Sequence, residues 1–333
     1  MSASDGLGAA VRVRTLPVVL GVLVALLLLP SCTRAEPGAV SLGAPSDVAF
    51  WGDSLTEGWP APPFATDRSD SMPGVFAARN PTSKVYNGGV AGQSAAEVAI
   101  RQGGLTLRLS VKGGRIPRAG EVEVAPVDVL GWRLDRYWSS VGTIAGVDGF
   151  LERDRTKFRF TRSGAGDPVP VDGPQTFLPT DGLERREAVQ VLFVGRNDID
   201  YDSPAGDAAD RVVAATQAMV EFLPNGQRAL VCGTTTATTE GRGTDGYREI
   251  ALINARLAAE YPYSYFDVRG WLVHDAIRAL GITPTAEDLA NMAADTLPPS
   301  IMVADDTVHY SPATAAALAQ EIQVQLADRG WAT

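Results

Sequence analysis

A serine follows the first apolar run of the folded part of the sequence, in the segment Gly52-Asp53-Ser54-Leu55-Thr56. A serine on a tight, glycine-bearing turn at the carboxyl end of a strand is exposed and can serve as a nucleophile. A segment this short also arises by chance, and Asp53 or Ser54 could equally cap a helix. Taken alone, the segment therefore suggests nucleophilic catalysis without establishing it.

An aspartate precedes a histidine by three residues in Asp306-Thr307-Val308-His309. At this spacing the carboxylate can reach the imidazole ring within one loop, fix its tautomer and stabilise the imidazolium that forms when the ring takes a proton. Asp305 competes with Asp306 for this role. The second histidine, His274, lies in an apolar segment typical of a helix and has no comparable partner motif.

Two further polar segments could supply hydrogen-bond donors to a reacting carbonyl group. The first, residues 87–94, is rich in glycine, which lets the backbone approach a substrate and present its N–H groups. The second, Gly195-Arg196-Asn197-Asp198, follows an apolar run, so that the Asn197 amide could point into a cleft. Either segment alone could also be a simple turn.

Together and in this order, the four segments resemble the conserved blocks of the SGNH hydrolases, the GDSL lipase and esterase family. The resemblance covers about residues 46–102 and 187–330. It implies that Ser54 is the nucleophile, that His309 is the general base and later the acid, and that Asp306 orients His309. It also implies an oxyanion hole made of the Ser54 N–H, the Gly92 N–H and the Asn197 side chain. Asp53 is expected to brace its loop.

The activity that this resemblance implies is that of a serine esterase, which forms an acyl-enzyme and needs no metal or organic cofactor. The expected substrates are short-acyl or O-acetyl esters, including those on cell-envelope glycan. Two alternatives stay open: an acyltransferase that uses the same triad, and a non-catalytic lipoprotein that binds the cell envelope and whose α/β frame has lost its enzymatic activity. A frame without activity is expected to have lost some of its catalytic residues. Because Ser54, Asn197, Asp306 and His309 are all present, the non-catalytic alternative is the less favoured.

These segments require a frame of alternating strands and helices. Apolar runs predict strands at residues 47–51, 85–86, 189–194, 229–232 and 265–268, and helical spacing predicts helices at 95–102, 207–223, 247–261 and 312–329. This alternation predicts an α/β fold with a parallel central sheet covered on both faces, in three layers. Ligands in such folds bind at the carboxyl ends of the strands. The frame is predicted to comprise residues 46–102 and 187–333.

Residues 103–186 show a different pattern, which predicts a small all-β module inserted into the frame. Its strand candidates are residues 105–111, 121–124, 143–147, 157–162, 169–171 and 175–178, with helical spacing only near 134–140. Its aromatic side chains could stack on sugars or acyl chains, but most are expected to form a small core: Trp132, Tyr137, Trp138, Phe158 and Phe160. Because the insert leaves the frame soon after Gly92 and returns before Asn197, we hypothesise that it borders the cleft and selects the substrate.

The N-terminus has the pattern of a secretory signal. Arg12 and Arg14 precede a charge-free run at residues 16–29, which is short for a permanent membrane span. The following Leu-Pro-Ser-Cys sequence resembles a bacterial lipobox, in which Cys32 would be lipidated. Residues 1–31 are thus predicted to be a signal peptide and residues 32–45 a flexible tether. We expect a domain anchored outside the bacterial cell membrane, or a secreted protein if Cys32 is incidental.

Composition restricts the partners. The 333 residues include 29 Lys and Arg against 39 Asp and Glu, a net charge of −10 that argues against a nucleic-acid or anionic-membrane surface. Two histidines and two cysteines exclude a His-rich metal site, a cysteine zinc site and a disulfide framework. We therefore expect a small-molecule or glycan ester as the substrate, and membrane contact only through the N-terminal anchor. Cys232 ends an apolar run and is expected to be an inert core residue.

Overall fold

The computed structural model describes residues 47–58, 68–129, 134, 138–154, 157–199, 206–224 and 228–331. The predicted signal peptide, the predicted tether and Cys32 lie outside these residues. Among the residues described, no helix has the length and apolar character needed to cross a membrane.

A parallel sheet of five strands forms the centre of the frame, in the order β13-β12-β11-β1-β2. The strands are β1 (Val48–Gly52), β2 (Val85–Gly89), β11 (Val189–Phe193), β12 (Ala229–Cys232) and β13 (Tyr265–Phe266). In the register of the sheet, Gly52 lies between Gly89 and Phe193. The carboxyl ends of β1, β2 and β11 therefore lie at the same end of the sheet, and the chain segments that follow them lie close together there. This parallel arrangement confirms the predicted architecture.

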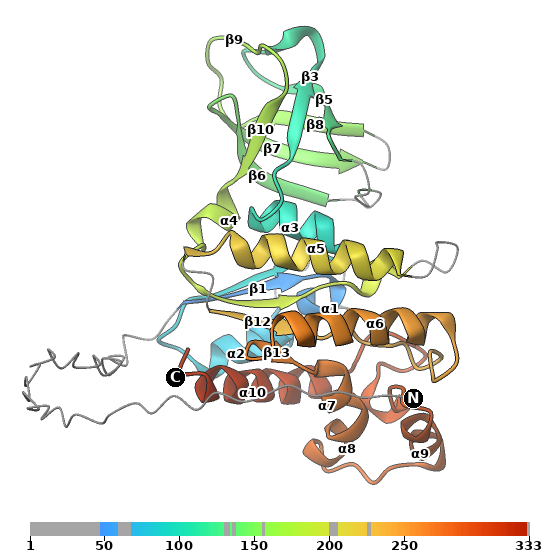
Figure 1. Cartoon of the computed structure of the whole chain (residues 1–333). Helices are drawn as coiled ribbons and strands as arrows, with labels where there is room; N and C mark the ends of the chain where they lie inside the picture. Colours follow the sequence, from blue (N-terminus) through green and yellow to red (C-terminus); the bar gives the residue numbers. More distant parts are fainter. Residues whose placement is uncertain are drawn as a thin grey trace, which may run out of the picture. The chain divides into compact units, whose positions relative to one another are not determined.

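Helices cover both faces of this sheet (Figure 1). Successive β1 residues point to opposite faces, because Phe50 packs in one core and Trp51 in the other. The Trp51 core includes residues of α3 (Ala95–Gln102), α5 (Asp207–Glu221) and α6 (Asp245–Glu260). The Phe50 core includes residues of α2 (Met72–Arg79), α7 (Val268–His274), α8 (Ala276–Ala279) and α10 (Pro312–Asp328). The remaining helices of the frame are α1 (Ser54–Glu57), α4 (Thr180–Glu184), α9 (Ala286–Ala293) and the 3-10 turns η2 (Arg196–Asp198) and η4 (Pro299–Ile301).

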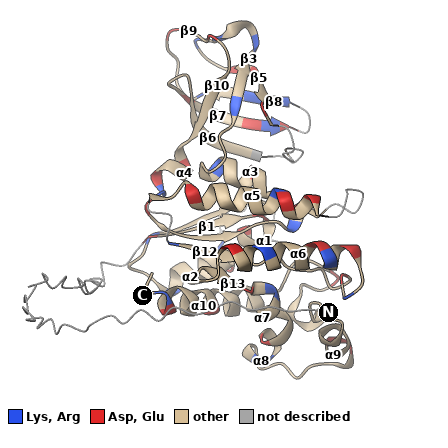
Figure 2. Ribbon diagram, viewed as in Figure 1, with Lys and Arg blue, Asp and Glu red and all other residues tan. Residues whose placement is uncertain are grey.

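The inserted module is a closed antiparallel barrel, whose strands follow the order β10-β3-β5-β8-β7-β6. They are β3 (Arg108–Val111), β5 (Glu121–Val127), β6 (Trp138–Ile144), β7 (Val147–Asp154), β8 (Lys157–Arg162) and β10 (Gln175–Pro179). The 3-10 turn η1 (Lys112–Gly114) and the pair β4 (Arg115–Ile116) and β9 (Val169–Pro170) complete the module. The predicted all-β insert is thereby confirmed. Acidic and basic residues lie side by side on its strands (Figure 2), as in the Arg159–Glu121 and Arg159–Asp154 ion pairs.

Two predictions for the insert were wrong in detail. The single strand predicted at residues 143–147 is divided between the end of β6 and the start of β7, because Ala145 and Gly146 form the turn between them with φ angles of 50° and 74°. The helical spacing near residues 134–140 was also misleading, because Trp138 to Ser140 begin β6. Phe158 and Phe160 are buried in the barrel core, as expected. Trp132, Tyr137 and the side chain of Trp138 lie outside the described residues.

The barrel joins the frame through α3 and α4. The α3 residue Ile100 is buried within the barrel core. Gly182 in α4 lies so close to α3 that a β-carbon there would come within 2.0 Å of the Gln102 carbonyl oxygen. The hypothesis that the insert borders the cleft and selects the substrate stays a prediction.

Candidate active site

Three side chains from two distant loops form one hydrogen-bonded line. The Ser54 Oγ lies 2.9 Å from the His309 Nε2, and the His309 Nδ1 lies 2.8 Å from the Asp306 Oδ2. This is the arrangement in which an imidazole can take a proton from a serine hydroxyl while a carboxylate stabilises the imidazolium. The structure brings together the serine, histidine and aspartate that the sequence singled out.

A tight turn at the carboxyl end of β1 places Ser54 just beyond the sheet, at the start of α1. Gly52 is required there, because a β-carbon would lie 2.2 Å from the Thr56 Oγ1 and 2.5 Å from the Phe193 carbonyl oxygen. Asp53 caps α1, and its Oδ1 accepts a hydrogen bond of 3.0 Å from the Leu55 N–H. Since Asp53 is the cap, the Ser54 hydroxyl can face His309. The capping and catalytic interpretations of this segment thus apply to adjacent residues.

Asp306 holds both the loop backbone and the imidazole ring. Its Oδ1 accepts hydrogen bonds from the backbone N–H groups of Val308 and His309, at 2.8 and 2.9 Å, while its Oδ2 faces the ring. Partial burial raises the pKa of Asp306, but these hydrogen bonds outweigh that effect and hold the pKa below its usual value. The carboxylate therefore stays ionised beside the ring. Asp305, the competing candidate, is exposed.

The amide of Asn197 connects three of the four predicted segments. Its Nδ2 donates to the Gln93 carbonyl oxygen at 3.0 Å and to the Asp53 Oδ2 at 3.3 Å. The donor predicted for the oxyanion hole is thus held beside the Ser54 turn and beside the segment that contains Gly92. Gly92 adopts a φ angle of 79°, a left-handed conformation that favours glycine.

Asp53 is a buried carboxyl group next to Ser54. Its exposed fraction is 1 %, and desolvation raises its pKa to about 6, even though the Leu55 N–H and the charge of Arg196 favour the ionised form. Its two oxygens bind the α1 backbone and Asn197. This geometry agrees with the expectation that Asp53 braces its loop.

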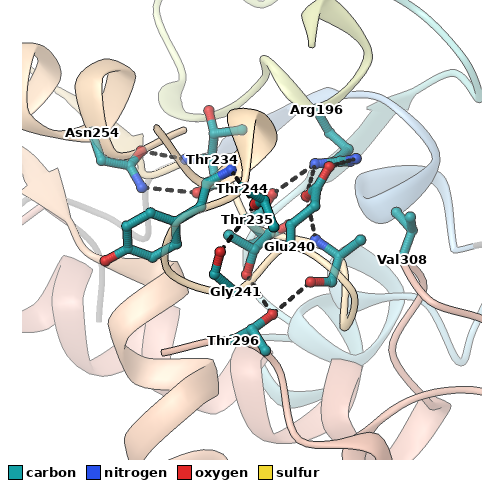
Figure 3. A network of polar contacts seen from close by, with 12 residues as sticks. Arg196, Thr234, Thr235, Glu240, Gly241, Thr244, Asn254, Thr296 and Val308 are labelled. Atoms are coloured by element: carbon teal, nitrogen blue, oxygen red, sulfur yellow. Dashed lines mark hydrogen bonds and ion pairs between the residues drawn. The ribbon is translucent and has the colours of Figure 1, made fainter. Parts of the chain in front are cut away.

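Two pairs near the site had no signal in the sequence. The Glu57 Oε2 accepts a hydrogen bond of 2.7 Å from the Ala91 N–H, next to Gly92, and its Oε1 pairs with Arg68 at 2.6 Å. Arg196 and Glu240 form a second, buried ion pair beside Asn197 (Figure 3). An acidic residue directly after the Ser54 segment is visible in the sequence, but its partner in space is not.

The remaining candidates lie apart from this line of side chains. His274 is at the end of α7, as its helical pattern predicted, with its Nε2 3.7 Å from the Asp295 Oδ1. Cys232 is 1 % exposed, and burial raises the pKa of its thiol far above the usual value, in agreement with an inert core residue. Within the described ranges, no three His, Cys, Asp or Glu side chains gather as a metal site would require.

Comparison with known proteins gives one relative in sequence and several in structure. No family model matches the chain. A tail spike protein of Salmonella phage epsilon15 is 26% identical over 251 residues, which cover 68% of this chain and 22% of the relative. The chain therefore spans about a fifth of the length of that protein.

Among solved structures, the chain is similar to a lipase/acylhydrolase from Enterococcus faecalis, at 12% identity and a TM-score of 0.44, covering 85% of this chain and 96% of that one. It is also similar to a catalytic mutant of Axe2, an acetylxylan esterase from Geobacillus stearothermophilus, at 14% identity and a TM-score of 0.43, covering 85% and 95%. A member of the lipolytic protein G-D-S-L family from Veillonella parvula DSM 2008 is 12% identical, with a TM-score of 0.41, and covers 84% and 96%. The chain resembles the SGNH hydrolases in its four segments, and its fold and the placement of Ser54, His309 and Asp306 agree with that resemblance.

Proposed function

We propose that this chain is a serine esterase of the SGNH type, which hydrolyses carboxylic esters through an acyl-enzyme. The observation that carries the proposal is the line of hydrogen bonds from the Ser54 Oγ to the His309 Nε2, and from the His309 Nδ1 to Asp306. A serine hydroxyl is a weak nucleophile at neutral pH until an adjacent base accepts its proton.

In the first half of the proposed reaction, the Ser54 Oγ attacks the ester carbonyl while the His309 Nε2 takes the hydroxyl proton. Asn197, with the N–H groups of Ser54 and Gly92, would donate hydrogen bonds to the oxyanion that forms. The oxyanion collapses, the bond to the alcohol oxygen breaks, and the alcohol leaves with the proton from His309. In the second half, His309 activates a water molecule that attacks the acyl carbon and releases the acid together with free Ser54.

We propose acetyl esters as the preferred class, in line with the short-acyl substrates that the sequence resemblance implies. A small cavity lies beside His309 and is lined by Leu55, Gly58, Asp70, His309, Tyr310, Pro312 and Ala315. We expect turnover to fall along a series of p-nitrophenyl esters from acetate to octanoate. Equal turnover across that series would contradict a small acyl site.

The location and the natural alcohol are proposed from the sequence. The signal-like N-terminus with Cys32 favours an enzyme outside the cell membrane, where O-acetyl groups on envelope glycan are within reach. Release of acetate from acetylated glycan, measured beside acetate transfer to an added sugar, separates an esterase from an acyltransferase. Transfer exceeding hydrolysis would assign the triad to the second activity.

The catalytic proposal is tested with Ser54→Ala. We expect the variant to lose ester turnover by about 10⁴-fold or more, and a fluorophosphonate probe to label wild-type protein at Ser54 but not the variant. The variant should keep its fold, because removal of one hydroxyl leaves the apolar contacts in place. Wild-type protein that neither turns over esters nor reacts with the probe would refute the proposal and favour the binding lipoprotein.

The barrel is the proposed substrate-selecting module. A variant in which a short linker replaces residues 106–179, leaving α4 in place, is expected to keep activity on p-nitrophenyl acetate and to lose activity on polymeric substrates. Such a linker is feasible because β3 and β10, the first and last strands of the barrel, pair directly with each other. Unchanged activity on every ester would remove the barrel from substrate selection.

A further inference from the structure

Arg196, the residue before Asn197 in the sequence, forms a two-pronged ion pair with Glu240 (Figure 3). The Arg196 Nη1 donates to the Glu240 Oε2 at 2.7 Å, and the Nη2 donates to the Oε1 at 2.9 Å. The exposed fractions of the two side chains are 12% and 5%. Pairing of this kind fixes the orientation as well as the distance of both partners.

The arginine belongs to the loop that carries Asn197. This loop runs tightly against the loop that follows β12, because a β-carbon on Gly195 would lie 2.6 Å from the Thr234 Oγ1. The Thr234 hydroxyl donates to the Val194 carbonyl oxygen at 3.0 Å, and the Arg196 Nη1 also reaches the Thr235 carbonyl oxygen at 3.3 Å. The position of Arg196, and with it the adjacent Asn197, is therefore tied to the loop after β12.

The glutamate belongs to that second loop, which is itself firmly anchored. The Glu240 Oε2 accepts a hydrogen bond from the Ala237 N–H at 2.6 Å. The Asn254 side chain binds both the N–H and the carbonyl oxygen of Thr234, and the Thr296 hydroxyl donates to the Ala237 carbonyl oxygen. These bonds hold residues 234–240 in one conformation (Figure 3).

The same loop binds the segment that carries the triad histidine. The Thr238 N–H donates to the Thr307 carbonyl oxygen at 2.8 Å, and Thr307 lies between Asp306 and His309. Peptide bonds and hydrogen bonds thus connect Asn197, through the Arg196–Glu240 pair and residues 237–238, to the loop of His309.

We propose that Arg196 and Glu240 are positioning residues, which hold the Asn197 donor and the Asp306–His309 loop at a fixed separation across the reacting carbonyl group. This inference rests on the proposed esterase function. Both Nη atoms of Arg196 donate to the Glu240 carboxylate, so the pair joins the loop after β11 to the loop after β12. Because a displacement of about 1 Å can cost roughly 100-fold in rate, such a pair affects chemistry without touching the substrate.

The test uses variants that separate positioning from folding. Arg196→Met alone leaves the Glu240 carboxylate buried without its partner, which is strongly destabilising. The double variant Arg196→Met/Glu240→Gln removes both charges and keeps an amide oxygen that can accept from the Ala237 N–H. Arg196→Lys keeps the charge but loses the two-pronged geometry. Turnover of p-nitrophenyl acetate is divided by the concentration of sites that a fluorophosphonate probe labels at saturation, so that misfolded protein is not counted.

We expect kcat per labelled site to fall by about 10- to 100-fold in the double variant, with KM changed by no more than about two-fold, and to recover in part in Arg196→Lys. The matched control is Arg269→Met, which breaks the similarly buried ion pair between Arg269 of α7 and Asp295, just after α9. It should lower the melting temperature and leave kcat per labelled site unchanged.

A double variant with wild-type kcat per labelled site would overturn the proposal and leave the pair a structural role. An equal loss in Arg269→Met would overturn it as well, because the effect would then follow from any broken ion pair. If the proposed esterase function itself is wrong, the result is different: wild-type protein then shows neither ester turnover nor labelling of Ser54.

Discussion

The hydroxyl of Ser54 and the imidazole of His309 are 255 residues apart in the sequence, and their Oγ and Nε2 atoms lie 2.9 Å apart in the fold. A second contact reinforces this approach, because the Tyr310 hydroxyl donates to the Leu55 carbonyl oxygen at 2.9 Å. Each catalytic candidate therefore has a neighbour in sequence that binds the opposite loop. The distance between the Ser54 Oγ and the His309 Nε2 is set by the backbone of both loops as well as by the two side chains.

Asp306→Asn tests whether the carboxylate controls the state of the ring. The Asn oxygen can still accept from the N–H groups of Val308 and His309, so the loop should keep its shape. Its amide group would face the His309 Nδ1, favouring the tautomer whose Nε2 carries the proton and cannot accept one from Ser54. We expect kcat on p-nitrophenyl acetate to fall by about 10⁴-fold.

Asp305→Asn is the control for this change. Asp305 is the adjacent carboxylate and has a φ angle of 61°, a conformation that asparagine tolerates. Its activity should stay within about two-fold of wild type, since small surface changes rarely alter a site. Equal losses in both variants would contradict the assignment of the triad aspartate.

Asn197→Ala removes the side-chain donor proposed for the oxyanion hole. We expect kcat to fall by about 100- to 1000-fold, because one such donor typically contributes that much to the rate. Asn80→Ala is the control: Asn80 is a buried asparagine outside the site, and its Nδ2 donates to the Phe76 carbonyl oxygen in α2. Steady-state kinetics of both variants should show loss of kcat for Asn197→Ala alone, and a loss confined to KM would argue against an oxyanion role.

The buried carboxyl of Asp53 makes stability depend on pH. Its pKa is about 6 in the folded protein, against 3.8 for a solvent-exposed aspartate in the unfolded chain. Between these values the folded protein holds a proton that the unfolded chain has released, so Asp53 stabilises less as the pH rises through this window. A shift of roughly two units corresponds to about 3 kcal/mol.

Asp53→Asn cannot ionise and should not show this dependence. Urea unfolding at a series of pH values is therefore expected to show the variant gaining about 3 kcal/mol relative to wild type between about pH 4 and pH 7. Parallel stability curves for the two proteins across that range would mean that Asp53 is not the titrating group.

Glu57 should influence turnover through the glycine-rich loop. Its Oε2 holds the Ala91 N–H, so Glu57→Ala is expected to loosen the loop that contains Gly92 and to lower kcat per labelled site by about tenfold. Glu57→Gln retains an acceptor oxygen and should lose less. As a control, Glu123→Gln breaks the Lys112–Glu123 ion pair on the barrel. If Glu57→Ala matched this control in activity, the loop would not depend on Glu57.

The sequence predicted the strands and helices of the frame well where residues within or next to a segment determine its structure. The apolar run at residues 189–194 is β11, buried throughout its length, and the helix at 95–102 begins with a capping box of Ser94 and Glu97. The strand predicted at 265–268 ends early at Phe266, because the Asp267 side chain accepts from the Gly270 N–H and starts α7 at Val268. An apolar run alone does not reveal this change from strand to helix.

Contacts between distant residues could not be predicted in the same way. The four segments identified Ser54, Asp306 and His309, but the Arg196–Glu240 pair joins residues 44 apart that belong to different loops. Such a pair depends on the order of the strands in the sheet, which brings the loops after β11 and β12 together. In the barrel, alternation indicated strands, but the left-handed residues Ala145 and Gly146 decided where β6 turns into β7.

The pairing of β3 with β10 makes the barrel an exchangeable cassette. Its entry and exit are neighbouring strands, so the frame needs only one small gap between α3 and α4 to accommodate it. Evolution could then replace the whole module while β1, β11 and the His309 loop retained their geometry. The same chemistry could in this way be redirected to new surfaces by recombination at a single junction.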